Sequence, residues 1–177
     1  EYGAGFIALG ELYTQANEVA PAAEAYANAA PFYPDDHDVQ LLAGQSLQAA
    51  ERYEEATSVL LRASELDESS YRAYFHLGAC LNELARFSEA RRALEEAVRL
   101  RPDLAEAARE LARAATELGD ERMALDAYER AIELDPDYAL GHLAIGRLRE
   151  KAGDDRKAAD AYEQAVQLDP EDTSLRA

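Results

Sequence analysis

The clearest element of this sequence is the stretch from Ala139 to Pro170, ALGHLAIGRLREKAGDDRKAADAYEQAVQLDP. Small and apolar residues recur at intervals of three and four on both sides of a Gly-Asp turn at residues 153–154. This spacing is typical of amphipathic helices. We therefore predict two short helices, neither of which is stable alone because its single apolar face needs a partner.

The same pattern occurs five times along the chain, at one constant interval and without insertions. Each copy has a small residue in its first helix and, in its second, two alanines with a larger residue between them. The matching positions are Gly10, Gly44, Gly78, Ala112 and Gly146; Ala22, Ala56, Ala90, Ala124 and Ala158; Tyr26, Leu60, Leu94, Tyr128 and Tyr162; and Ala29, Ala63, Ala97, Ala131 and Ala165. We expect the small first-helix residues to allow a neighbouring backbone to approach closely and the larger residues to fill the space between layers.

Proline and polar residues mark the ends of the copies. A proline cannot continue the preceding helix, so prolines are expected to close four of the units, at Pro34, Pro102, Pro136 and Pro170. The next residue is predicted to accept hydrogen bonds from the free amides of the following helix, and the predicted caps are Asp35, Ser69, Asp103 and Asp137. Pro31 is expected to end the second helix of the first unit early.

This pattern resembles the tetratricopeptide repeat (TPR) family from Gly3 to Pro170. The resemblance implies an all-α fold, a right-handed superhelical solenoid of antiparallel helix pairs. It implies a single domain over residues 1–177, with repeats at 3–36, 37–70, 71–104, 105–138 and 139–172 and the stub of a further helix at 173–177. The apolar side of the last layer is then expected to be exposed, or covered by a missing sixth unit or by a neighbouring molecule.

Composition excludes several partners. The chain has 36 acidic and 18 basic residues, a formal net charge of −18. We therefore expect neither general nucleic-acid binding nor binding to an anionic membrane, since both need an electropositive surface. Because no apolar run is long enough to span a membrane, we expect no direct membrane insertion and a cytoplasmic protein. A periplasmic or membrane-tethered location stays open because the chain starts at Glu1 rather than Met.

The sequence shows no recognisable catalytic, metal-binding or cofactor-binding site. The single cysteine, Cys80, lies among apolar residues and is expected to be buried and inert. His37 has Asp35, Asp36 and Asp38 beside it, but such clusters between helices are more often caps and turns than metal sites. No phosphate-binding, nucleophile-elbow or zinc-protease motif occurs. We therefore predict that the chain is not an enzyme and has no catalytic, metal-binding or cofactor-binding residues.

The TPR resemblance implies a concave groove lined by the first helix of each unit. The groove positions of the family fall on Ile7, Leu41, Gln45, Gln48, Phe75, Ala79, Asn82, Arg109, Arg113, Leu143 and Arg147. Apolar residues and amides occupy the N-terminal part, and the three arginines form a cationic patch further along. The alternative is that Glu106, Glu110 and Glu117 neutralise the arginines in ordinary surface ion pairs.

We therefore predict a protein–protein interaction scaffold that binds a peptide segment or helix of a partner in this groove. Apolar side chains of the partner would meet Ile7, Leu41 and Phe75, and acidic ones the arginines. One alternative is a self-assembling structural element, a homo-oligomer that stacks through its end repeats. Another is a targeting arm of a larger enzyme, or a secretion-type chaperone.

Overall fold

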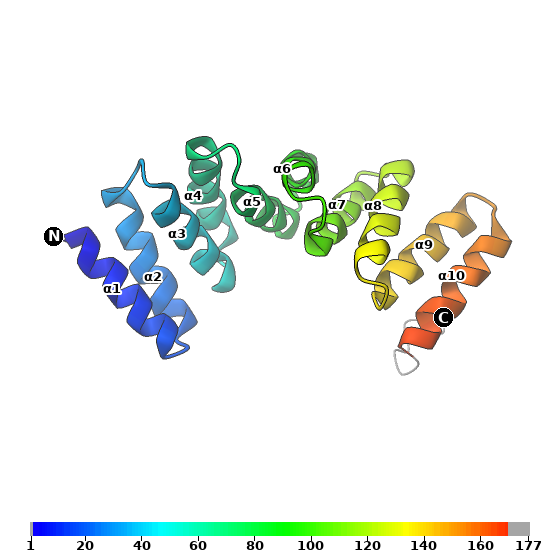
Figure 1. Ribbon diagram of the computed structural model, residues 1–177, viewed down its shortest axis with the longest axis horizontal. Helices are drawn as coiled ribbons and strands as arrows, with labels where there is room; N and C mark the ends of the chain where they lie inside the picture. The colour runs from blue at the N-terminus through cyan, green and yellow to red at the C-terminus, as the bar shows by residue number, and fades with distance from the viewer. Residues whose placement is uncertain (1, 170–177) are drawn as a thin grey trace. The chain divides into compact units, whose positions relative to one another are not determined.

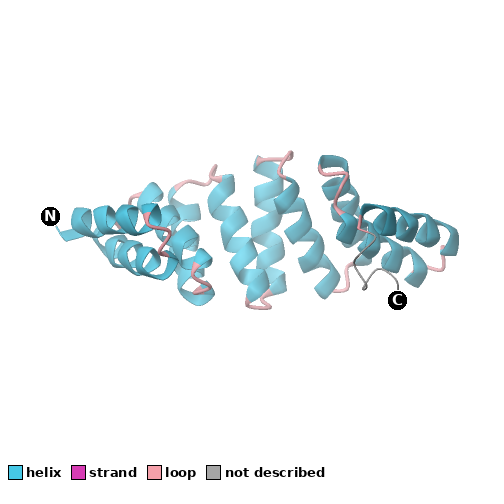
Figure 2. Ribbon diagram, turned by 90° about the horizontal axis from the view of Figure 1, so that it is seen from below, coloured by secondary structure: helices cyan, strands magenta, loops and turns pink. Residues whose placement is uncertain are grey.

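The structure is a computed structural model that describes residues 2–169. In this range it consists of ten α-helices and one short 3-10 helix, without strands (Figures 1 and 2). The elements are α1 (Tyr2–Gln15), α2 (Val19–Ala29), η1 (Ala30–Phe32), α3 (His37–Ala49), α4 (Tyr53–Leu66), α5 (Tyr71–Glu83), α6 (Phe87–Leu100), α7 (Ala105–Glu117), α8 (Glu121–Leu134), α9 (Ala139–Lys151) and α10 (Asp155–Leu168). The all-α prediction is confirmed, while the expectations for Pro170 and residues 173–177 lie outside the described residues.

The helices pack as antiparallel pairs, α1 with α2, α3 with α4, α5 with α6, α7 with α8 and α9 with α10. The later pairs start at the constant interval of the sequence repeat, at His37, Tyr71, Ala105 and Ala139. The chain forms two compact units, Glu1–Arg101 (unit 1, α1 to α6) and Pro102–Ala177 (unit 2, with α7 to α10). A single domain of five repeats stays a prediction.

A residue in the left-handed backbone conformation joins the two helices of each pair. Asn17, Glu51 and Ala85 have φ values of 59°, 59° and 55°, and the glycines at the equivalent positions, Gly119 and Gly153, have 71° and 76°. Glycine adopts this conformation without steric cost, whereas other L-residues lose about 1 kcal/mol or more. The last two hairpins are therefore the ones whose turns the sequence marks most clearly.

The core of each pair combines a small residue of the first helix with two alanines and one large residue of the second. The ten repeated alanines are at most 5% exposed. A Cβ atom added to Gly44 would lie 2.4 Å from the Leu60 side chain. A Cβ atom added to Gly10, Gly78 or Gly146 would likewise meet the large side chain of the paired helix. The expectation of a close backbone was therefore wrong: the large side chain of the paired helix occupies the space above each glycine.

The large residue is buried in four pairs but not in the last. Leu60 and Leu94 are fully buried, and Tyr26 and Tyr128 are nearly so. Tyr162 is half-buried, and its hydroxyl donates a hydrogen bond to Glu150 Oε2 at 2.7 Å. Because α10 is the last described helix, no described layer covers its outer side, and Tyr162 is not the buried filler that the repeat pattern predicts.

The helix caps lie one residue later than predicted. The Asp36 side chain accepts hydrogen bonds from two amides at the start of α3, and Ser70 caps α5. Leu104 and Tyr138 take the cap positions of α7 and α9 and have no capping side chain. The extra residue is needed for the chain to turn after the preceding helix before the next one begins.

The early end of α2 is confirmed. This helix has 11 residues, against 14 in the second helix of the following pair, and η1 with Pro31 follows it directly. Across residues 2–169, no helix combines the length and the apolar character that crossing a bilayer requires.

The glycine contacts predict opposite effects for two Gly→Ala substitutions. Gly78→Ala should destabilise the chain by about 1–3 kcal/mol, since the new Cβ would lie 2.4 Å from Leu94 Cγ. Gly5→Ala, at an open position in α1, should stabilise it by about 0.5–1 kcal/mol. Urea unfolding of both variants measures the difference, and a stabilising Gly78→Ala would contradict this account of the core.

Candidate functional site

The structure divides the predicted groove residues of unit 1 by burial. Leu41, Ala79 and Asn82 are 8%, 7% and 1% exposed, so their side chains belong to the interior in this conformation. The partly exposed residues are Ile7, Gln45, Gln48 and Phe75. These four remain candidates for contact with a partner.

His76 connects two of these candidates across neighbouring layers. Gln45 Nε2 in α3 lies 2.9 Å from His76 Nε2 in α5, and Gln48 Oε1 lies 2.6 Å from His76 Nδ1. A neutral imidazole with its proton on Nδ1 fits both bonds, since it donates to Gln48 and accepts from Gln45. The two amides are thereby held in place on the surface of α3.

Burial keeps His76 neutral. It lowers the pKa of the imidazole from 6.5 to about 4, and the nearby positive charge of Arg72 acts in the same direction. The Phe75 ring lies 5.0 Å from the imidazole, centroid to centroid. We define these five residues, Ile7, Gln45, Gln48, Phe75 and His76, as the amide surface of unit 1.

The sequence prediction did not include His76 among the site residues. The available signal was its separation from Gln45 and Gln48 along the chain, which is close to one repeat length in both cases. In stacked repeats, such a separation places residues on equivalent helices of adjacent layers.

The arginines of unit 2 do not share one environment. Arg109 forms an ion pair with Asp135, and its guanidinium carbon lies 4.6 Å from the centre of the Tyr138 ring. Arg113 Nη1 lies 3.8 Å from Glu110 Oε2, one of the pairings in the alternative interpretation. These contacts give Arg109 a role in packing α7 against the end of α8 and the start of α9.

Arg147 and Leu143, both in α9, have opposite exposures. Arg147 is exposed and forms no ion pair within residues 2–169. Leu143 is 8% exposed and forms a core cluster with Ala165. Of the predicted residues in unit 2, Arg147 therefore remains a candidate for contact with a partner.

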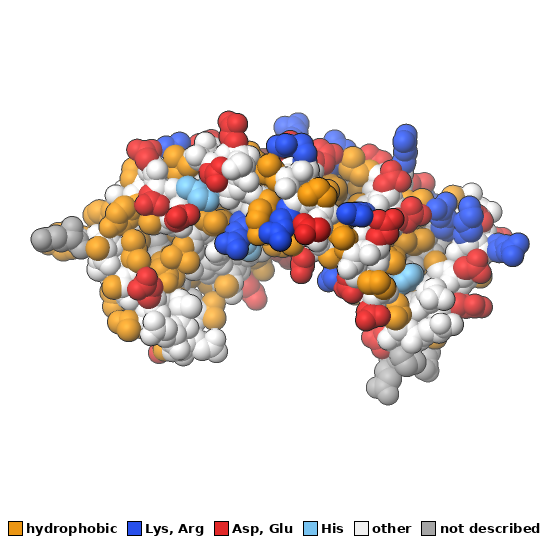
Figure 3. Space-filling model, in the orientation of Figure 1, with side chains coloured by type: hydrophobic (Ala, Val, Ile, Leu, Met, Phe, Trp, Pro, Cys, Tyr) orange, Lys and Arg blue, Asp and Glu red, His pale blue; other side chains and the backbone are white. Residues whose placement is uncertain are grey.

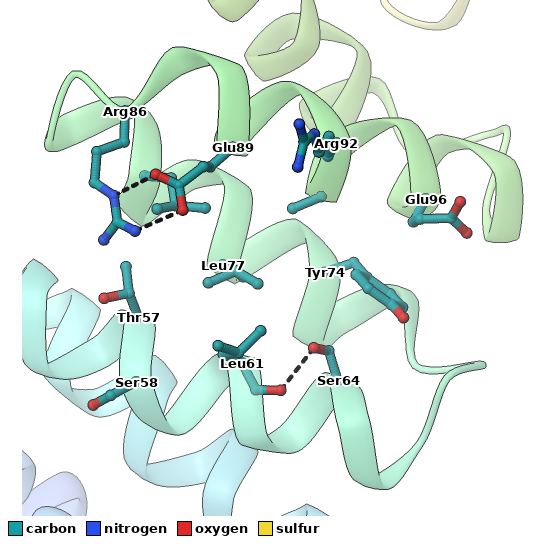
Figure 4. A pocket seen from close by; sticks show the side chains of 12 residues that line it. Thr57, Ser58, Leu61, Ser64, Tyr74, Leu77, Arg86, Glu89, Arg92 and Glu96 are labelled. Carbon is teal, nitrogen blue, oxygen red and sulfur yellow. Dashed lines mark hydrogen bonds and ion pairs between the residues drawn. The ribbon is translucent and has the colours of Figure 1, made fainter.

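Unit 1 also contains a cavity that the sequence did not indicate. It has a volume of about 490 Å³ and lies between α4 and α6, with Tyr74 and Leu77 of α5 between these two helices in Figure 4. The residues that line it are Thr57, Ser58, Leu61, Ser64, Tyr74, Leu77, Leu81, Arg86, Glu89, Arg92, Ala93 and Glu96. Its lining comes mainly from second helices, because α4 and α6 both contribute to it.

A smaller hollow of about 270 Å³ lies beside the amide surface. It is formed by the end of α1, the start of α2 and one side of α3, and Gln45 is part of its lining. In Figure 3 the surface over α1 and α2 is largely hydrophobic or uncharged, with few acidic or basic side chains.

The residues considered for metal or redox chemistry have structural environments. His37 Nδ1 lies 3.0 Å from the Ala63 carbonyl oxygen, and its Nε2 lies 3.2 Å from Ser70 Oγ. Burial raises the pKa of the Cys80 thiol to about 12, in line with the expected inert cysteine. Residues 2–169 contain no group of three or more His, Cys, Asp or Glu side chains placed to hold a metal ion.

Comparison with known families identifies the repeat. The tetratricopeptide repeat model matches residues 41–103, 83–139 and 111–173. The chain belongs to the tetratricopeptide repeat family. Proteins of this family are scaffolds for protein–protein interaction. A comparison with curated protein sequences finds no significant match.

Solved structures share the fold at low sequence identity. MamA aligns with a TM-score of 0.86 and 21% identity, over 100% of this chain and 97% of its own. MamA from Desulfovibrio magneticus RS-1, residue 41 to the end, aligns with a TM-score of 0.84 and 19% identity over 98% of each chain. YrrB, described as a TPR protein with an unusual peptide-binding site, aligns with a TM-score of 0.82 and 23% identity. The alignment covers 96% of this chain and 87% of the YrrB chain.

The His76 environment predicts a pH-dependent contribution to stability. Its folded-state pKa of about 4 lies below the ordinary 6.5, so the neutral imidazole stabilises the fold fully above pH 6.5 and loses this effect as the pH falls towards 4. Between pH 7 and 4.5, the wild-type chain should lose about 2 kcal/mol more unfolding free energy than His76→Asn. Urea unfolding at both pH values measures this difference, and equal losses would contradict the prediction.

Proposed function

We propose that the amide surface of unit 1 binds an extended segment of a partner protein. The observation that supports this proposal is the fixed orientation of Gln45 and Gln48, which His76 holds at 2.9 and 2.6 Å while both amides stay partly exposed. Polar groups held in place before binding lose little conformational entropy when a partner arrives.

The free hydrogen-bonding groups match a peptide backbone. The Gln45 amide nitrogen donates a hydrogen bond to His76, which leaves the Gln45 carbonyl oxygen as an acceptor. The Gln48 carbonyl oxygen accepts a hydrogen bond from His76, which leaves the Gln48 amide nitrogen as a donor. One acceptor and one donor side by side suit the N–H and C=O groups of an extended chain, and an apolar side chain of that chain would lie against Phe75.

In unit 2 a separate contact is proposed, in which an acidic side chain of a partner meets Arg147. Arg147 is exposed and forms no ion pair within residues 2–169. A carboxylate of a partner can therefore gain a charge-assisted bond at this side chain. Arg109 is left out of this role because Asp135 and Tyr138 already hold it.

Peptides selected on phage from a random library test the amide surface. A peptide that binds the full chain should lose about tenfold in affinity with Phe75→Ala or Gln48→Ala, since about 1.4 kcal/mol of contact is removed. Phe32→Ala is the matched control, because Phe32 is 54% exposed and outside the surface. Fluorescence anisotropy measures the affinities.

Two outcomes of that experiment would contradict the proposal. One is a set of peptides whose affinity is the same for Phe75→Ala, Gln48→Ala and wild type. The other is a larger loss with Phe32→Ala than with the two surface variants. The variant Arg147→Glu tests the acidic contact in unit 2, since it should lower the salt dependence of any peptide that binds there.

Self-assembly through an end layer is a second candidate function. The described part of α1 carries one charged residue, Glu11, and its exposed side chains include Tyr2, Leu9 and Leu12, at 81%, 43% and 61%. A helix that is apolar on all sides is normally buried. The outer side of α1 therefore favours a further contact.

The register of the repeats indicates what the outer side of α1 would contact. Ala8, Leu9 and Leu12 lie four repeat lengths before residues of α9 that pack on the core cluster of α7 and α8. Those α9 residues are Ala144, Ile145 and Leu148. The side of α1 that would pack on a preceding layer is thus apolar and exposed, and a second copy of the chain is the occupant we propose. A nearly uncharged contact also limits repulsion between copies of net charge −18.

Light scattering over a concentration series tests self-assembly. The wild-type mass should rise above that of one chain as the concentration increases, whereas Leu9→Glu with Leu12→Glu should stay monomeric because two buried carboxylates would oppose association. Leu118→Glu is the control, since Leu118 is 38% exposed and outside α1. A wild-type chain that stays monomeric throughout rules out this function.

The roles as targeting arm of a larger enzyme or as secretion-type chaperone stay predictions.

A further inference from the structure

Two arginines cross the boundary between the first two layers of unit 1. Arg52, at the start of α4, binds Glu24 of α2 at 2.7 Å. Arg62, later in α4, donates to the Pro34 carbonyl oxygen at 3.0 Å and forms an ion pair with Asp35 at 2.6 Å. Both side chains thus span from α4 to the preceding helix pair.

Neither link is repeated one layer further. Arg86 is the equivalent of Arg52, but Ser58 replaces Glu24, and Arg86 instead pairs with Glu89 of its own helix at 2.6 Å. The equivalent of Arg62 is Glu96, which pairs with Arg99 at 2.7 Å. Ser58 thus removes the equivalent of the Arg52 link between α4 and α6, and Glu96 removes the equivalent of the Arg62 link to the connection before the next helix pair.

The cavity of about 490 Å³ lies where these links are missing (Figure 4). Leu77 and Leu81 of α5 are 7% and 4% exposed and form its floor. Leu61 stands on its α4 side and is 51% exposed, whereas the equivalent residue of α2 is Ala27. The cavity therefore combines one exposed leucine with two largely buried ones, at a layer boundary of unit 1 that lacks the bridges found between its first two layers.

The charged side chains at the rim determine which charge a ligand of this cavity should carry. Glu89 and Glu96 are each in ion pairs with arginines of α6. Arg92 is exposed and lines the same cavity, and its charge acts on Glu89, which already pairs with Arg86. Three arginines, Arg86, Arg92 and Arg99, thus stand against these two glutamates, so the excess charge at the rim is positive and complements a carboxylate.

We propose that this α4–α6 groove is a second binding site, for a short protein segment with apolar side chains next to an acidic residue. The apolar side chains would fill the space above Leu77 and Leu81, and the acidic residue would pair with Arg92. The volume lies within the range of about 300–1,000 Å³ that is usual for sites burying a ligand. The site is separate from the amide surface and does not rest on its function.

Restoring the missing link tests the proposal. Ser58→Glu places a carboxylate opposite Arg86, as Glu24 stands opposite Arg52, and should close the groove without loss of fold. The bait for phage selection is the full chain with Phe75→Ala and Gln48→Ala together, so that peptides for the amide surface are selected against. Peptides of apolar and acidic composition should bind it and lose at least tenfold in affinity with added Ser58→Glu.

Matched variants separate closure from other effects. Ser58→Ala should keep the affinity, and Leu61→Ala and Arg92→Ala should each lower it severalfold. Circular dichroism and urea unfolding show that the variants are folded. Recovery of no peptide, or of peptides unaffected by Ser58→Glu and Leu61→Ala, overturns the proposal.

A fatty acid also combines an apolar chain with a carboxylate, so it is the other ligand that could fit the groove. Titration of dodecanoate into the chain, followed by calorimetry, distinguishes it from a peptide. Binding of dodecanoate that Ser58→Glu abolishes, without any groove-binding peptide, would assign the groove to a fatty acid and overturn the proposal of a protein segment. Loss of groove binding alone leaves the amide surface untouched, since its test uses Phe75 and Gln48.

Discussion

The fold depends on the contact between a small residue in the first helix of each pair and a large side chain of the second. Gly44 against Leu60 is the model case: the space that a Cβ would need is filled by the leucine. Because the contact recurs at the interval of the sequence repeat, every pair closes in the same way. In the fourth pair Ala112 takes the place of the glycine and belongs to the same core cluster as Tyr128.

Since the core is confined to these repeated positions, the other positions vary with little effect on the helix pairs. The amide surface uses this freedom, because Gln45, Gln48 and His76 differ from their counterparts in other layers. The α4–α6 groove uses it too, through Ser58 and Glu96. Both proposed binding sites therefore lie at departures from the repeat, while the repeat itself supplies the helices that carry them.

Several electrostatic features also follow from the position of each layer. Arg52 and Arg62 bridge layers because acidic residues or carbonyl oxygens lie within reach, whereas Arg109 lies over Tyr138 beside Asp135. Exposed ion pairs contribute little to stability. Their larger effect here is on access, because they cover one layer boundary and leave another open.

By itself the sequence determined the helix pairs, their interval, the early end of α2 and the family, since these depend on local periodicity and on strong breakers such as Pro31. It did not determine which groove positions are accessible: Leu41, Asn82 and Leu143 are buried, although their register resembles that of exposed neighbours. The half-burial of Tyr162, the His76 bonds and the α4–α6 cavity were decided by tertiary structure alone. They depend on which side chains of adjacent layers meet, and distances between layers are not encoded in the periodicity of one helix.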